Sequence, residues 1–228
     1  ASLDIKGKIP ATELFVRGDA VAGVSGTYDI RDALRAPNGI VSLRAIKAKF
    51  LGVNVDSATA GVRLAGKTRG SFQFAAMTRA GVSANAAGTL ESVDSTRVLH
   101  LDTLTVGLSD HRWALTSPVR VVTDRSGMIL DPVILANGLG GRVAVSGTIP
   151  NTRPVALTVR VDSLALSDLA TVAEVTTALQ GYVSLDGQIT GTKLHPEIRL
   201  TSVGSNLRVG KIVLERVLSN ATYKDRRF

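Results

Sequence analysis

Residues 181–202, GYVSLDGQITGTKLHPEIRLTS, contain the pattern that decides the fold of this chain. Apolar and polar side chains alternate there, with Val183, Leu185 and Ile189 in the apolar positions. Because successive side chains of a β-strand point to opposite faces of a sheet, the alternation predicts strands with one aliphatic and one solvated face. Glycines interrupt the run and are expected to let the sheet bend, and the His-Pro pair at 195–196 is expected to turn the chain.

The same alternation recurs along the chain. It is clearest in five further segments: 40–50, 97–106, 141–149, 155–161 and 206–214. Turn signals rich in glycine, proline and asparagine separate the runs, and their spacing predicts about fifteen strands. Residues 141–154 and 181–196 also share one arrangement of glycines, apolar positions and a closing proline. This repetition indicates an all-β protein whose sheet is extended by successive similar strands.

One segment departs from the alternation. Residues 167–180 have a helical spacing of apolar side chains, at Leu169, Val172, Val175 and Leu179. Ser167 is one candidate for the helix N-cap, and Thr171 with Glu174 forms an alternative capping box. Gly181 stands where a helix often ends in glycine. We therefore expect a short amphipathic helix near 167–180 that lies against the sheet or plugs one end of it.

The composition excludes several classes of function. The chain has 228 residues and a net charge of +8, but its basic residues stand singly between apolar neighbours and only 4% of residues are aromatic. A nucleic-acid surface would cluster basic and aromatic residues, so we expect no nucleic-acid partner. The absence of cysteine excludes disulfides and thiolate chemistry. The sequence has no apolar run long enough to span a membrane and opens within a strand pattern, so we expect a piece of a longer chain.

No constellation of residues indicates catalysis. His100, His111 and His195 lie far apart without metal-ligand spacing, and each is interpreted as a polar surface residue. The carboxylate pairs Asp29 with Asp32 and Asp102 with Asp110 are better explained by solvated turns and strand edges than by acid–base chemistry. We therefore predict a protein that is not an enzyme and has no metal or cofactor.

The aliphatic strand faces must be covered by something. Two interpretations remain open: the faces bury each other in a closed sandwich or barrel, or they line a groove open to apolar ligands. A uniformly aliphatic surface with few aromatic anchors favours a groove that accepts acyl chains. The predicted lining residues are Val143, Val145, Val155, Leu157, Val159, Val161, Val183, Leu185, Ile189, Ile198 and Leu200.

The C-terminal half resembles a known family. Residues 159–223 contain LSDL at 166–169, then a stretch at 181–202 of the form GxVxLxGxIxGTxxxPxIxLxS, then LRVGKIVLERV at 207–217. This arrangement is similar to that of the AsmA-like envelope proteins, and most similar to the translocation and assembly module subunit TamB family. The best-matching cycles lie in 141–228, and looser cycles lie at 35–64.

The resemblance implies a long curled β-sheet, or β-taco, so we expect residues 1–228 to form a single elongated β-sheet region. It also implies a bridge-like lipid-transport protein of the bacterial periplasm, anchored in the inner membrane through a segment outside this chain. Its partners would be phospholipid acyl chains and an Omp85-type outer-membrane barrel, whose assembly function it would support. The alternatives are a structural or adhesion-type β module, or a scaffold subunit that binds a protein through a sheet edge.

Overall fold

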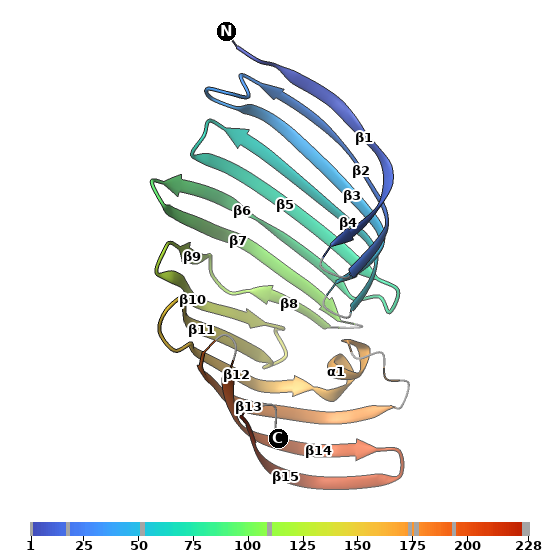
Figure 1. Ribbon diagram of the computed structural model, residues 1–228. Coiled ribbons are helices and arrows are strands. Elements are labelled where there is room, and N and C mark those ends of the chain that lie inside the picture. Colours follow the sequence, from blue (N-terminus) through green and yellow to red (C-terminus); the bar gives the residue numbers. More distant parts are fainter. Residues whose placement is uncertain are drawn as a thin grey trace. The chain divides into compact units, whose positions relative to one another are not determined.

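The computed structural model describes residues 2–16, 19–50, 53–108, 111–172, 175, 178–192 and 195–224. These residues form fifteen β-strands and one short α-helix, α1 (Figure 1). The protein is therefore all-β, as the alternation predicts. The chain divides into two compact units, unit 1 at Ala1–Gly107 and unit 2 at Leu108–Phe228. That residues 1–228 form one elongated region stays a prediction.

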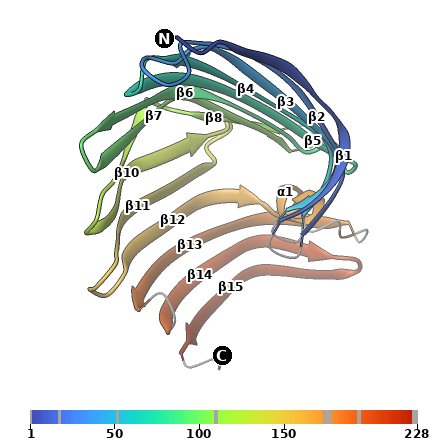
Figure 2. The same ribbon diagram turned by 45° about the horizontal axis from the view of Figure 1, so that its top comes forward.

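Unit 1 is an antiparallel sheet in which every strand pairs with the next one in the chain. Its strands lie side by side and bend along their length, so this sheet is curled (Figures 1 and 2). The described elements of unit 1 are all strands of this one sheet, and none of them forms a second layer. The strands are β1 Ile5–Val16, β2 Asp19–Arg31, β3 Asn38–Phe50, β4 Val53–Ala65, β5 Arg69–Thr78, β6 Ser83–Val93 and β7 Thr96–Leu108.

Unit 2 is also antiparallel, and its strands from β10 to β15 pair in chain order. The two short strands β8 and β9 both pair with β10. The break between them falls at Thr116–Pro118, since Pro118 has no N–H to donate to a neighbouring strand. The elements are β8 His111–Leu115, β9 Val119–Thr123, β10 Gly127–Ala136, β11 Arg142–Pro150, β12 Ala156–Ala165, α1 Leu166–Val172, β13 Leu179–Gly191, β14 Pro196–Val209 and β15 Ile212–Tyr223.

The helix is shorter than predicted. It covers Leu166–Val172, and the expected extent to residue 180 is wrong because Leu179 already pairs with Val209 as the first residue of β13. Ser167 lies inside the helix, where its carbonyl accepts a 2.9 Å hydrogen bond from Thr171 Oγ1. Gly181 lies inside β13 with a φ of +110°, so it does not end the helix. Glu174, of the alternative capping box, lies outside the described residues.

Few apolar side chains are buried. Across the described residues they are Leu108, Trp113, Val119, Val155, Ala165 and Ala170. A closed sandwich would instead bury the inner-facing side chains of two sheets against each other. The seven-residue α1 is much shorter than the roughly 20 residues that a membrane-spanning helix needs. Among the described residues, no helix is long and apolar enough to cross a membrane.

Candidate functional site

The strand register places ten of the eleven predicted lining residues on one face of unit 2. Directly paired residues of antiparallel strands share a face, and Val145 pairs with Val159 between β11 and β12. Leu157 pairs with Ile189 between β12 and β13, and Ile189 pairs with Ile198 on β14. We call this set the aliphatic face of unit 2: Val143, Val145, Leu157, Val159, Val161, Val183, Leu185, Ile189, Ile198 and Leu200, with Val133 and Leu135 of β10.

These side chains are partly buried rather than enclosed. Each predicted lining residue of β11 to β14 shields its neighbours on the sheet but keeps some contact with solvent. The residues between them on β12, Thr158 and Arg160, are exposed on the opposite face. The eleventh residue, Val155, precedes β12 and is buried, and its N–H donates a 2.6 Å hydrogen bond to the carbonyl of Gly191. Their role as a lining stays a prediction.

Unit 1 carries a second aliphatic face that the sequence-based residue set does not include. One row runs across all seven of its strands: Gly7, Tyr28, Val41, Val62, Phe72, Gly88 and Leu101 pair in succession. Parallel rows beside it contain Ile9, Leu43 and Phe74, and Ile30, Leu64 and Leu99. We call these three rows the aliphatic face of unit 1. The alternation in 40–50 and 97–106 is the signal that finds it.

Some glycines on both faces have a neighbour's side chain close to the position of their missing Cβ. A Cβ at Gly7 would lie 2.5 Å from the Tyr28 hydroxyl, and a Cβ at Gly88 would overlap the carbonyl oxygen of His100 and also lie 2.9 Å from the Phe72 ring. A Cβ at Gly187 of unit 2 would meet Leu200 at 2.9 Å. The side chains of Tyr28, Phe72 and Leu200 therefore occupy space that a Cβ at these glycines would need.

A hollow of about 840 Å³ lies over β1 to β4 of unit 1. Its lining contains Ile9 and Leu43 of the aliphatic face, but also Lys8, Ser25 and Arg44 of the opposite alternation. The hollow is therefore not a purely aliphatic trough, and the candidate surface for apolar ligands is the broad face rather than an enclosed pocket.

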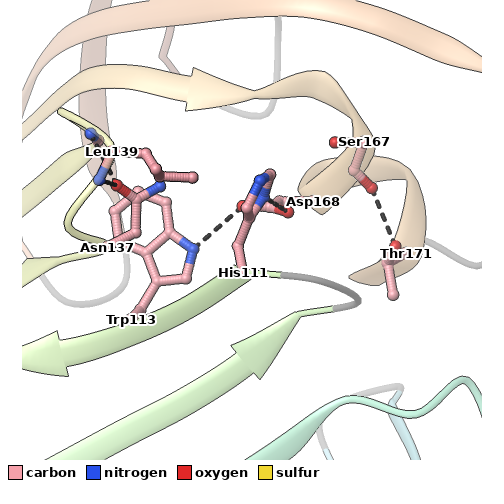
Figure 3. A network of polar contacts seen from close by, with 8 residues as sticks. His111, Trp113, Asn137, Leu139, Ser167, Asp168 and Thr171 are labelled. Carbon is pink, nitrogen blue, oxygen red and sulfur yellow. Dashed lines mark hydrogen bonds and ion pairs between the residues drawn. The ribbon is translucent and has the colours of Figure 1, made fainter.

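A buried polar cluster joins α1 to β8. Asp168 of α1 is 1% exposed, and its Oδ1 lies 2.7 Å from His111 Nδ1. Its Oδ2 accepts a 3.0 Å hydrogen bond from Trp113 Nε1 (Figure 3). The interpretation of His111 as an ordinary surface residue is therefore wrong. The contact could not be predicted, because a lone aspartate in a short helix gives no sequence signal for a partner 57 positions away. Asp168 was missed for the same reason.

The remaining candidates for chemistry are not brought together. His100 pairs with Thr89 on the face opposite Leu99 and Leu101, and His195 lies in the turn before β14. Asp110 lies outside the described residues, so its pairing with Asp102 is not described. Among the residues that the structure does describe, no group of three or more histidines and carboxylates is arranged to hold a metal ion.

Three carboxyl groups at the surface have shifted pKa values. The Lys6 ammonium, 2.8 Å away, lowers the pKa of Asp29, and Lys224, 2.6 Å away, lowers that of Glu197. Hydrogen bonds from the Ser126 hydroxyl and backbone lower the pKa of Asp124 in the turn before β10. A lowered pKa stabilises the fold above the unfolded pKa, and this contribution is lost as pH falls through the folded pKa. All three groups are in contact with solvent, so their ion pairs and hydrogen bonds are surface interactions and do not form a reactive site.

No family model, curated protein or solved structure matches this chain.

Proposed function

We propose that the two aliphatic faces bind the acyl chains of phospholipids and that the chain is a segment of a bridge-like lipid-transport protein. The observation that supports this is the uncovered aliphatic face in each unit, aligned in register from strand to strand. A soluble protein rarely exposes an apolar surface that extends over many strands unless it binds something there. The proposed role is non-catalytic.

The transfer free energy of methylenes suits an acyl chain that moves along the face. Each methylene that leaves water for such a face gains about 0.8 kcal/mol, so a few buried methylenes hold a lipid while no single contact is strong. The predicted lining residues of unit 2 are all Val, Leu or Ile and present no polar group, and the rows of unit 1 add Phe72, Phe74 and Tyr28, whose hydroxyl is the one polar side-chain group named on that face. An acyl chain therefore finds a similar environment on each successive strand, and it moves along the face without a deep energy minimum.

The wider setting of this proposal comes from the resemblance to the AsmA-like and TamB families. On this resemblance we propose a location in the bacterial periplasm, between the inner and outer membranes, with an inner-membrane anchor supplied from outside this chain. The resemblance also suggests a second role, in which the protein supports the assembly of outer-membrane proteins by an Omp85-type barrel.

A second candidate function is binding of a protein partner through a sheet edge. Strand β15 pairs with β14 on one side, and its apolar side chains are strongly exposed, with Ile212 at 63% and Leu218 at 67%. A long edge strand with exposed apolar residues is a template for strand addition. This observation favours a scaffold or adhesion-type module. The protein partner would bind at the edge strand β15, whereas lipid would bind on the aliphatic faces.

Site-specific photo-crosslinking in cells tests the lipid proposal. A photo-reactive residue at Val159, which pairs with Val145 and Gly187 on the aliphatic face, is expected to capture phospholipid. The same residue at Thr158 is the matched control, since this neighbour is exposed on the opposite face. Equal capture at both positions, or none at Val159, would contradict the proposal. Capture of a protein at Leu218 without lipid at Val159 would favour the partner-binding function.

A further inference from the structure

Helix α1 lies on the aliphatic face of unit 2, at one end of its strands. Leu115 of β8 pairs with Leu135 of β10, which belongs to that face, and His111 and Trp113 share the phase of Leu115. Asp168 of α1 reaches both of these side chains (Figure 3). The helix therefore sits over the face where β8 begins and β12 ends.

Buried side chains gather at this helix, although Val119 and Val155 of unit 2 are buried as well. Trp113 is 2% exposed, and Ala170 and Asp168 of α1 are also buried. The indole also covers Gly141, where a Cβ would lie 2.7 Å from the Trp113 ring. The rest of the face, from Val143 to Leu200, keeps contact with solvent. The same surface thus has a covered end and an uncovered stretch.

The bond that holds the cover in place is polar, although the surface around it is aliphatic. A buried carboxylate with two donors gives little net stability, because desolvation offsets most of its attraction, and an apolar side chain would hold a permanent cover at least as well. A helix of seven residues is also too short to be stable alone, so its position depends on these contacts. The hydrogen bonds of Asp168 therefore suit a helix that can move off the face and return to one defined position.

We propose that α1 is a displaceable cover on the aliphatic face of unit 2, held closed by Asp168, and that acyl chains reach Trp113 when it opens. This inference rests on the proposed lipid function. Leu169, on the outer side of the helix, is 40% exposed and offers an apolar contact to an arriving chain. When Asp168 moves away, Trp113 and His111 lose their buried hydrogen-bond acceptor. This loss favours the return of α1 to its closed position once the acyl chain has moved on.

Trp113 is the only tryptophan of the chain and reports the state of the cover directly. Phosphatidylcholine vesicles with brominated acyl chains quench tryptophan on contact, and unbrominated vesicles of the same composition are the control. If lipid displaces α1 in about half of the molecules, brominated chains reduce Trp113 emission about two-fold.

A reversible lock provides the matched variant. The chain contains no cysteine, so His111→Cys with Asp168→Cys introduces a single thiol pair where the two side chains meet. A short bis-methanethiosulfonate links the thiols and holds α1 closed, and a reductant releases it in the same sample. We expect quenching in the reduced form and none in the linked form, with far-UV circular dichroism unchanged between the two. Asp168→Asn, which keeps the shape and removes the charge, is expected to increase quenching over the native protein.

The outcomes separate the cover from the lipid proposal. Equal quenching in linked and reduced forms overturns the cover while lipid capture at Val159 leaves the proposed function standing. Quenching in the reduced variant but none in the native protein shows a permanent cover and also overturns the inference. Absence of both quenching and capture at Val159 overturns the cover together with the proposed function.

Discussion

Replacing Gly147 by alanine is expected to lower the free energy of unfolding by about 3 kcal/mol or more. Gly147 of β11 pairs with Leu157 and has a φ of +135°, a region that L-residues rarely adopt. A Cβ there would overlap the carbonyl oxygen of Ala156 and lie 2.9 Å from the Leu157 Cα. These are backbone atoms of the neighbouring strand, so the strain is relieved only by separating β11 from β12.

Two other glycines provide a graded control for this effect. Gly187 occupies the equivalent position in the repeated motif, but its missing Cβ faces the flexible end of Leu200, so Gly187→Ala is expected to cost only about 1 kcal/mol. Gly61 has no atom within 4 Å of its Cβ position, and Gly61→Ala is expected to be neutral or slightly stabilising. Thermal unfolding followed by circular dichroism measures all three, with a fall of roughly 6 to 12 °C for Gly147→Ala. Equal melting of Gly147→Ala and Gly187→Ala would contradict this account.

The two glycines also show what a repeated motif predicts and what it leaves out. Sequence alignment of 141–154 with 181–196 gives Gly147 and Gly187 the same place, yet one meets backbone and the other a side chain. The shared motif treats the two glycines alike. The difference arises from the neighbouring strand, and no pattern within one strand contains that information.

The shared face was predictable because alternation and register are linked. A slip of one residue would move every Val and Leu of a strand to the other side, so neighbouring strands align their apolar phases. Even an irregularity keeps this phase: β12 gains one residue at Ser163, with a φ of +50°, so that Leu164 pairs with Val183 on the same face as Val161. The alternation therefore predicted ten residues that share this face, but it did not predict Val133, Leu135 or the bulge.

The helix boundary and the polar cluster were not predictable in the same way. Leu179 fits both the helical spacing with Val175 and the strand alternation that continues to Val183, and pairing with Val209 on β14 decides between them. Asp168 meets its partners through the fold alone. A local pattern describes faces well, whereas contacts between distant elements require the strand pairing first.

The largest effect on lipid binding is expected in unit 1, from Val41→Asp. Val41 lies in the central row of the aliphatic face, between Tyr28 and Val62, and is partly buried. A carboxylate there keeps water on the face and removes the contact of about two methylenes, which is worth about 1.6 kcal/mol. The amount of phospholipid retained by the purified protein is therefore expected to fall about ten-fold.

Ser42→Asp is the matched control, because it makes the same change of charge at the adjacent residue on the opposite face. Ser42 is exposed and pairs with Thr27 and Gly61. It should retain lipid like the native chain, which separates loss of the aliphatic contact from repulsion of anionic headgroups. Val41→Thr, which keeps the volume and adds a hydroxyl, should fall between the two. Equal retention by Val41→Asp and Ser42→Asp would show that acyl chains do not use this face, because a chain lying along the central row crosses Val41 and never meets Ser42.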